Sequence, residues 1–357
     1  MDIGDELQDE FQIEEGSEGV KNGILALARD IRKELAKMDI TEEEFEKMVG
    51  DVDGLSQKET GNPVVDSLDM EQVVLAKCEP PQWMTPENII SDASESVANV
   101  YNNPLSDRIL EDSKDFLAGK IRTLDLHYNI KNTDREVGVG LSGLIYEQME
   151  RLGALGNDQV ITINTVGEGG HNYGAWSGNG MVIRHEGSLN DSVGQGMSGN
   201  AKIILRVHRD LREREGQVLV GNQACMWATG GTFYCPGKAG ARLGVRNSGA
   251  VIVSEGATDY PFEYMTDGEG YMLDDWISDI GSRMTGGKIF AYDPTRERRQ
   301  RISKDYVAID EMQDMDFDDL KERLEDYFKE TQSQKAGRIL ENCDTEKLNF
   351  VKIVPLK

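Results

Sequence analysis

The sequence has few cysteines, few aromatic residues and no long apolar run. Its 357 residues include four cysteines, far apart and without a C-x-x-C pair: Cys78, Cys225, Cys235 and Cys343. This spacing is typical of reduced cytosolic thiols, and it argues against a disulfide framework or an iron–sulfur cluster held by this chain alone. No segment approaches the roughly 18 apolar residues of a membrane helix, and the acidic N-terminus lacks the apolar core of a signal peptide. We therefore expect a cytoplasmic protein without a membrane partner.

Positive charge is scarce as well. Lysine and arginine total 39 against 65 acidic residues, so the formal net charge is −26. The phosphates of nucleic acids and anionic membranes repel such a chain, and we expect neither as a partner. The one basic segment, "DPTRERRQRISK" (293–304), does not offset this charge. We predict that it is a solvated or partner-facing loop.

Motifs of catalysis are missing too. There is no G-x-S-x-G nucleophile elbow and no P-loop, and the histidines show no i,i+4 metal spacing. The histidines, which we expect to be isolated polar residues on a sheet surface, are His127, His171, His185 and His208. Cys225 and Cys235 lie in apolar runs, which predicts small buried hydrophobic residues rather than reactive thiols. We therefore assign no catalytic, cofactor-binding or metal-binding residue to this chain.

Glycine, in contrast, is abundant, with 38 residues that lie mostly between Gly138 and Gly287. Six segments in this region share a small polar residue, then a glycine, then a strand-like run. The aligned glycines, separated by steps of 21, 31, 19, 19 and 18 residues, are Gly178, Gly199, Gly230, Gly249, Gly268 and Gly286. A period near twenty with a strand and a tight turn in each unit is typical of a β-solenoid. We predict that these glycines supply positive φ angles at structural turns, and that the neighbouring apolar residues stack inward.

One of these turns, "SVGQGMSG" (192–199), contains the G-x-G-x-x-G pattern of dinucleotide-binding loops. A loop of that kind follows a strand and opens a helix, whereas the strand-like run "KIIL" comes next in this sequence. A second match, "GVGLSG" (138–143), does lie in a helical pattern, but "NTDREV" precedes it instead of a strand. Both glycine motifs are therefore predicted to be structural, without a bound nucleotide.

The sequence pattern predicts a mainly β protein in four parts. They are an acidic, mainly helical N-terminal extension (1–104), a helix–strand–helix lead-in (105–155), a glycine-rich β-helix (156–293) and a helical tail with a final strand (294–357). Helices are expected at 105–118, from Thr133 or Asp134 to Gly153, and at 314–341. Strands outside the repeats are expected at "TLDLHYNI" (123–130) and "NFVKIVPL" (349–356).

Several segments together resemble the C-terminal domain of the glutamate synthase large subunit. They follow that family's order: "NIKNTDREVGVGLSG" (129–143), "GMSGNAKIIL" (196–205), "RLGVRNSGAVIVSEGATDYPFEYMTDG" (242–268) and "MTGGKIFAYD" (284–293). The tail segments "YFKETQSQKAGRILEN" and "FVKIVPLK" are similar to the family's closing helix and last strand. The resemblance runs from about Leu105 to the end, about 70% of the chain, and residues 1–104 have no recognised counterpart. It implies a right-handed β-helix.

The resemblance also implies a division of labour. In that family, a glutaminase domain uses an N-terminal cysteine nucleophile, and a barrel-shaped synthase domain holds FMN and an iron–sulfur cluster. This chain begins Met1-Asp2-Ile3, has no early cysteine and lacks the length for the barrel. We therefore expect a noncatalytic structural subunit that braces separate glutaminase and FMN synthase polypeptides and the ammonia route between them. FMN and the iron–sulfur cluster are expected in those partners, and no cofactor in this chain.

Two alternatives remain. Related stand-alone domains serve in N-methylglutamate synthase, and a similar β-helix occurs in a subunit of formylmethanofuran dehydrogenase. One alternative is thus the equivalent subunit of another oxidoreductase or amidotransferase complex. The other is a self-assembling structural protein or a small-molecule binding module.

Overall fold

The computed structural model describes residues 103–152, 159–208 and 216–356. The chain divides into two compact units, Met1–Asn99 and Val100–Lys357, and all the described residues belong to the second. The expected helical extension 1–104 therefore lies outside the described residues, apart from its last two, and stays a prediction.

The second unit begins with a helix–strand–helix segment. It consists of α8 (Pro104–Asp112), α9 (Lys114–Leu117), β1 (Thr123–Ile130) and α10 (Val139–Leu152). Two helices replace the single one predicted at 105–118, and they separate at Ser113, whose hydroxyl donates back to the Ile109 carbonyl (2.6 Å). Helix α10 begins later than predicted because Glu136 and Gly138 have φ angles of 54° and 86°, which an α-helix does not accommodate.

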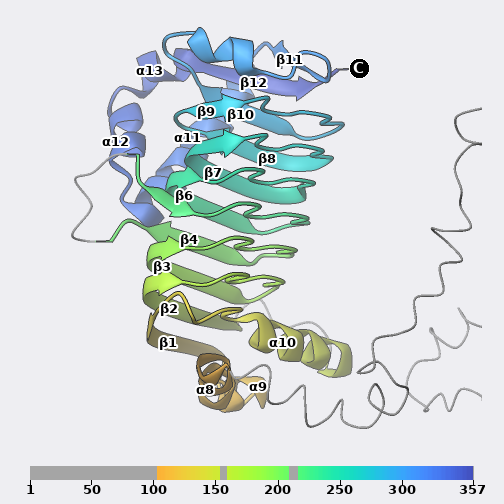
Figure 1. The fold of residues 1–357 in the computed structure, drawn as a ribbon, viewed down its shortest axis with the longest axis vertical. Helices are drawn as coiled ribbons and strands as arrows, with labels where there is room; N and C mark the ends of the chain where they lie inside the picture. Colours follow the sequence, from red (N-terminus) through yellow and green to blue (C-terminus); the bar gives the residue numbers. More distant parts are fainter. Residues whose placement is uncertain (1–102, 153–158, 209–215, 357) are drawn as a thin grey trace, which may run out of the picture. The chain divides into compact units, whose positions relative to one another are not determined.

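Parallel strands then coil into a β-solenoid, which confirms the predicted fold class (Figure 1). The strands are β2 (Val160–Gly169), β3 (Met181–Leu189), β4 (Lys202–Arg206), β5 (Val218–Val220), β6 (Thr232–Ala239), β7 (Ser248–Asp259), β8 (Asp267–Met272), β9 (Trp276–Ser278) and β10 (Lys288–Tyr292). The hydrogen-bonded order β1-β2-β3-β4-β6-β7-β8-β10 follows the chain, so each coil pairs with the coils before and after it. Strand β1 of the lead-in is thus the first strand of the stack.

The inward side chains of successive coils stack in register, as predicted. Ile163 pairs with Ile183, and Ile183 with Ile203. Ile203 pairs in turn with Phe233, and Phe233 with Ile252. All five are fully buried. Because each residue packs on its equivalent about 4.8 Å away, a continuous core forms from mostly aliphatic side chains.

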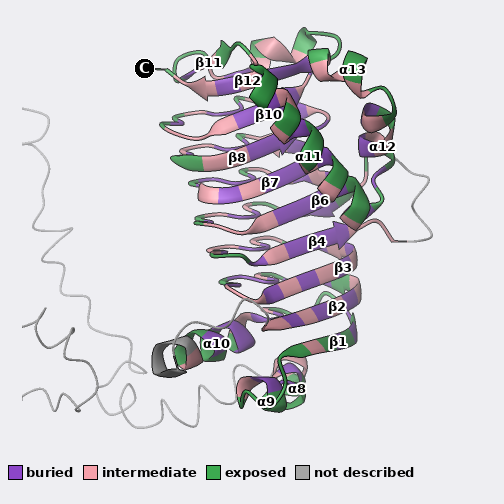
Figure 2. Cartoon of the chain, turned by 180° about the vertical axis from the view of Figure 1, so that it is seen from behind, coloured by how far each residue is buried: buried purple, intermediate pink, exposed green. Residues whose placement is uncertain are grey.

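The C-terminal tail covers one outer face of the coils. Outward-facing residues of β4, β6, β7, β8 and β10 form a second apolar cluster with helices α11 (Asp314–Thr331) and α12 (Gln334–Glu341). Figure 2 shows α11 crossing these strands. The single helix predicted at 314–341 is interrupted at Gln332, whose left-handed φ of 59° ends α11. The helix pair removes from water a sheet face that would otherwise be an exposed apolar patch.

Antiparallel pairing ends the parallel stack. Strand β12 (Phe350–Pro355), close to the predicted final strand, pairs antiparallel with β10 and with β11 (Val307–Asp310). The short helices between these strands are η2 (Glu297–Arg301), α13 (Cys343–Glu346) and η3 (Lys347–Asn349). An open edge on β10 would be a template for pairing with another chain, and β12 occupies it.

Candidate functional site

Each coil turns through a corner in which every second residue has a left-handed backbone. In the corner between β3 and β4, Ser192, Gly194 and Gly196 have φ angles of 63°, 64° and 65°. The same alternation recurs in the other coils, even where the residue is not glycine. Cys225 and Phe262, which correspond to Gly194, have φ angles of 57° and 60°. In the corner between β3 and β4, the N–H groups of the left-handed residues donate alternately to the following and the preceding coil.

The amides of "SVGQGMSG" are already bonded to other coils. Carbonyls of the following coil accept the N–H groups of Ser192 (2.8 Å) and Gly196 (2.8 Å), and the preceding coil accepts that of Gly194 (2.9 Å). Gln195 and Met197 donate within the turn, at 3.3 and 3.1 Å. A phosphate-binding loop needs unpaired N–H groups that point at the ligand. These residues form a turn whose amides are bonded mainly to the two neighbouring coils.

The six predicted turn glycines lie where each corner leads into the next strand, but they differ in backbone angle. Gly199 and Gly268 have positive φ, 58° and 91°. The four without positive φ, for which the predicted reason is wrong, are Gly178, Gly230, Gly249 and Gly286. At Gly249 and Gly286 a Cβ would overlap a backbone carbonyl of the preceding coil. Close approach between coils therefore excludes a side chain at these two positions.

A second pair of glycines, which the repeat alignment misses, marks a bend inside two successive coils. Gly167 and Gly187 face each other in register between β2 and β3. A Cβ on either one would overlap the backbone carbonyl of the coil before it. The two glycines are one repeat length apart in the sequence, and this spacing is the signal for a position where the preceding coil leaves no room for a side chain.

A column of equivalent residues runs along the outer edge of the corner. Its members occupy one position in successive coils, and each donates its backbone N–H to the carbonyl just before the next member. We call these six residues the corner column: Trp176, Gly196, Trp227, Arg246, Tyr264 and Arg283. Trp176 and Trp227 are 49% and 46% exposed. The guanidinium groups of Arg246 and Arg283 lie 5.5 and 5.3 Å from the centre of the Tyr264 ring, at cation–π distance.

One histidine is buried, contrary to the predicted surface position. His185 is 1% exposed and lies in the core beside Tyr173. The Thr165 hydroxyl donates to its Nδ1 (2.8 Å), and its Nε2–H donates to the Ser188 carbonyl (3.3 Å). Burial lowers the pKa of His185 from 6.5 to about 4. The imidazole is therefore neutral at neutral pH and has a structural role.

A partly buried carboxylate, that of Glu255, lies in the seam between the coils and the tail helices. The hydroxyls of Tyr327 (3.3 Å) and Ser333 donate to Oε1 of Glu255. Burial raises the pKa of this carboxyl, and the hydrogen bond from Ser333 opposes the rise. A cavity of about 210 Å³ adjoins it, where Lys335 is paired with Asp274. Because these polar groups bond to one another, they fix the tail to the coils.

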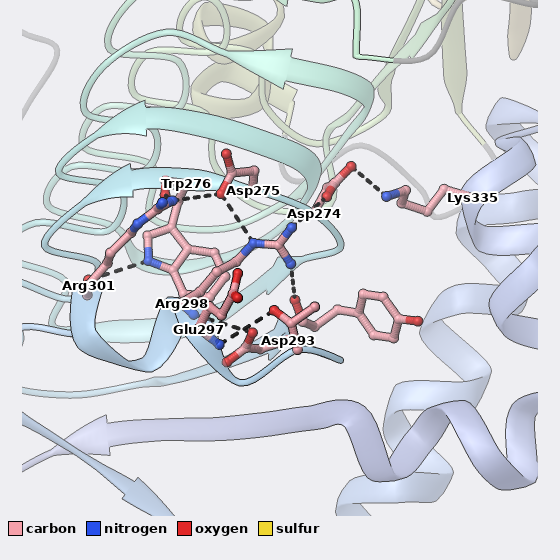
Figure 3. Close-up of polar contacts among 10 residues, drawn as sticks. Asp274, Asp275, Trp276, Asp293, Glu297, Arg298, Arg301 and Lys335 are labelled. Carbon is pink, nitrogen blue, oxygen red and sulfur yellow. Dashed lines mark hydrogen bonds and ion pairs between the residues drawn. The ribbon is translucent and has the colours of Figure 1, made fainter.

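The basic segment 293–304 is bonded inside the molecule, and the predicted solvated or partner-facing loop is wrong for its central arginines (Figure 3). Arg298 forms ion pairs with Asp274 (3.2 Å) and Asp275 (3.1 Å). Arg301 binds Asp275 (2.8 Å) and donates to the Trp276 carbonyl (2.6 Å). Lys335 of α12 reaches Asp274 from another side. The segment thus joins the last coils to the tail.

The described ranges offer little for chemical catalysis. Within them, histidine, cysteine and acidic residues nowhere gather in threes as metal ligands would. Cys225 and Cys235 are fully buried, as predicted, and burial raises the pKa of both thiols, that of Cys235 to about 12. Neither is therefore a thiolate nucleophile. In the same part of the chain, no helix has both the length and the apolar character to span a bilayer.

Comparison with known proteins gives one consistent relationship. The family model described as the GXGXG motif matches residues 106–356. The ferredoxin-dependent glutamate synthase of Antithamnion sp. is 30% identical over 347 residues, which cover 94% of this chain and 21% of that protein. The glutamate synthase [NADPH] large chain of Bacillus subtilis (strain 168) is 28% identical, with the same two coverages. The ferredoxin-dependent glutamate synthase of Pyropia yezoensis is 34% identical over 64% of this chain and 15% of its own length.

These matches reach beyond the solenoid. The chain spans about a fifth of the length of the Antithamnion and Bacillus relatives. Similarity over 94% of this chain takes in most of residues 1–104. The expectation that this N-terminal part has no counterpart is therefore wrong.

Proposed function

We propose a function from one premise: the chain belongs to the GXGXG family, which is that of the C-terminal domain of glutamate synthases. It is a noncatalytic structural subunit of a glutamate synthase-type complex. It braces a glutaminase-type amidotransferase and an FMN-binding synthase, and it helps to maintain the ammonia route between them. FMN and the iron–sulfur cluster belong to these partners.

One observation carries this proposal: the GXGXG match spans a solenoid whose corner amides and buried side chains hold successive coils together. Corner amides bond to the coils above and below, and the core residues stack in register. The buried histidine and thiols have pKa values that keep them neutral. A stack bonded at every coil suits the task of keeping two enzymes at a fixed separation.

The proposed complex works in the cytoplasm, in glutamate biosynthesis and nitrogen assimilation. Cys225, Cys235 and Cys343 are free thiols, which is typical of a reducing compartment. The glutamate synthase names of the relatives support glutamate as the product.

Reconstitution tests the bracing role. A glutaminase and an FMN synthase from the same organism are purified, and glutamate formation is measured with glutamine or with free ammonia, with and without the chain. We expect omission of the chain to lower glutamine-dependent synthesis while ammonia-dependent synthesis and glutamine hydrolysis persist, because only the transfer of ammonia between the enzymes needs the brace.

Two results would contradict the proposal. One is equal glutamine-dependent synthesis with and without the chain. The other is purification of the chain from its host, at low and high salt, with neither a flavoprotein nor an amidotransferase bound. Mass spectrometry of the product tests the alternative function. If the complex forms N-methylglutamate instead of glutamate, the chain is a subunit of an N-methylglutamate synthase-type complex.

A further inference from the structure

The sides of the solenoid differ in what covers them. Helices α11 and α12 seal one outer face, and β12 occupies the last strand edge. The corner column has no such cover among the described residues. Its two tryptophans keep about half of their surface in contact with solvent, at 49% and 46% exposure. Exposed aromatic side chains that adjoin one another are characteristic of binding surfaces.

The first half of the column is aromatic and uncharged. A Cβ on Gly196 would overlap the Trp176 ring, so this ring lies over the space that the glycine leaves. Trp227 occupies the next position along. Helix α10 borders this end, where the Tyr146 hydroxyl bonds to Ser198 and the Tyr146 side chain is itself 39% exposed. Three exposed aromatic side chains thus lie at this end of the column, on a chain in which 29% of the residues are charged.

The second half of the column is cationic. Arg246 and Arg283 are exposed, and both guanidinium groups lie near the Tyr264 ring. Among the described residues, no carboxylate lies within ion-pair distance of either guanidinium, whereas Arg298 and Arg301 are paired with aspartates. Arg283 also donates to the Tyr264 hydroxyl, and because a guanidinium has five N–H donors, others remain for a carboxylate.

We propose that the corner column docks one partner subunit of the complex described above, so this inference rests on the proposed function. The partner presents apolar cavities to Trp176 and Trp227, and carboxylates to Arg246 and Arg283. With strands about 4.8 Å apart, the six positions extend over roughly 24 Å, a length that fits a standard protein interface.

Charge favours a partner with this pattern over a second copy. Each copy of the chain carries −26, so two copies repel each other. The same net charge repels a partner's carboxylates over most of the surface. Arg246 and Arg283 therefore bind acidic groups of the partner at the corner column and fix the register of docking. The tryptophans supply most of the affinity.

The test measures binding of the full chain to each purified partner subunit, the FMN synthase and the glutaminase, by biolayer interferometry. Two double variants change the column: W176A with W227A, and R246E with R283E. The matched controls are Ile277→Ala, at an apolar residue of β9 that is 56% exposed, and Arg296→Glu, at an exposed arginine of the basic segment. Thermal melting verifies that every variant is folded.

We expect both column variants to weaken binding to one of the two partners at least about tenfold, and the controls to bind like the wild type. Binding by the wild type should weaken as salt rises, and the arginine variant should lose much of this dependence. If the complex forms and the column variants bind both partners like the controls, the docking surface is wrong and the proposed function stands.

Failure of the wild type to bind either partner would overturn the proposed function and this inference together. Sedimentation of the chain alone then shows what the column does instead. Self-association that disappears in the tryptophan variant would assign the surface to a second copy, and a monomer with unaltered variants would leave it without a docking role.

Discussion

We expect acid to destabilise the solenoid through one buried imidazole. His185 stacks in the core of β3 and is held by the Thr165 hydroxyl and the Ser188 carbonyl. Burial is the largest cause of its lowered pKa, and the hydrogen bond to Ser188 and the charge of Glu186 oppose it. Protonation would place a cation among Tyr173 and the stacked isoleucines, where no carboxylate is bonded to it.

The sign and the size of the effect follow from the two pKa values. Between pH 6.5 and about pH 4, the unfolded chain binds a proton at His185 that the folded chain does not bind. The free energy of unfolding therefore rises with pH across this window, and stability is lost as pH falls through it. At about 1.4 kcal/mol per pH unit, the change corresponds to about 3 kcal/mol. For a unit of this size, this is a melting temperature lower by about 6–12 °C.

The assay is urea denaturation of the wild type, H185Q and H171Q from about pH 4 to about pH 7. Glutamine keeps a donor and an acceptor at residue 185 but does not titrate, and His171 is an exposed control. Titration of Glu255, whose pKa is raised, changes stability in the opposite direction but contributes equally to all three proteins. The stability gap between wild type and H185Q should change by about 3 kcal/mol across the window. Parallel pH curves for these two proteins would refute the reasoning.

The remaining predictions concern the corner and the end of the stack. Gly199→Ala should lower stability by about 1–2 kcal/mol, because φ is 58° and the new Cβ would overlap the Asn179 side chain. Gly143→Ala, inside helix α10 where a Cβ meets open space, should raise it by up to about 1 kcal/mol; thermal melts of the two variants that move in the same direction would contradict this contrast. Arg298→Gln should cost about 1–2 kcal/mol in chemical denaturation because Asp274 and Asp275 each lose one of their two cationic partners and keep only Lys335 and Arg301. Arg296→Gln, at an exposed arginine, should stay within about 0.5 kcal/mol, and equal costs would show that the ion pairs do not hold the end of the stack.

The repeat made the solenoid predictable because each coil meets the same demands within about twenty residues. The positions of the inward residues and of the corner are local properties, so they recur in the sequence as a period. The requirement for glycine at some of these positions depends, in contrast, on the neighbouring coil. Gly249 and Gly286 have ordinary angles, and the backbone of the neighbouring coil excludes their side chains. The distance between coils, which decides this, is a property of the stack.

The sequence contains signals for two polar residues whose surroundings were predicted wrongly, His185 and Arg298. In "MVIRHEG", His185 follows Met181 and Ile183 with period two, and this alternation places it on the inward side with them. Arg298 lies 23 residues after Asp275, close to one repeat length, so the fold brings these opposite charges into adjacent coils. The two-residue alternation within the strand predicts the inward position of His185, and comparison of residues about twenty apart predicts the pairing of Arg298 with Asp275. The hydrogen bonds that Glu255 accepts in the seam come from residues of the tail helices and of their junction, and the coil repeat contains no signal for them.

The backbone of the corner gives an independent reason to regard its outer side chains as functional. Trp176, Trp227 and Arg246 adopt left-handed φ angles of 61°, 58° and 56°, in which a bulky side chain costs about 1 kcal/mol or more. Gly196 occupies the same position at 65° without this cost. These side chains also remain half-exposed or exposed, so burial recovers only part of the cost. A coil corner built for stability alone would carry glycine at each of these positions, and binding to a partner gives the larger side chains a compensating contribution.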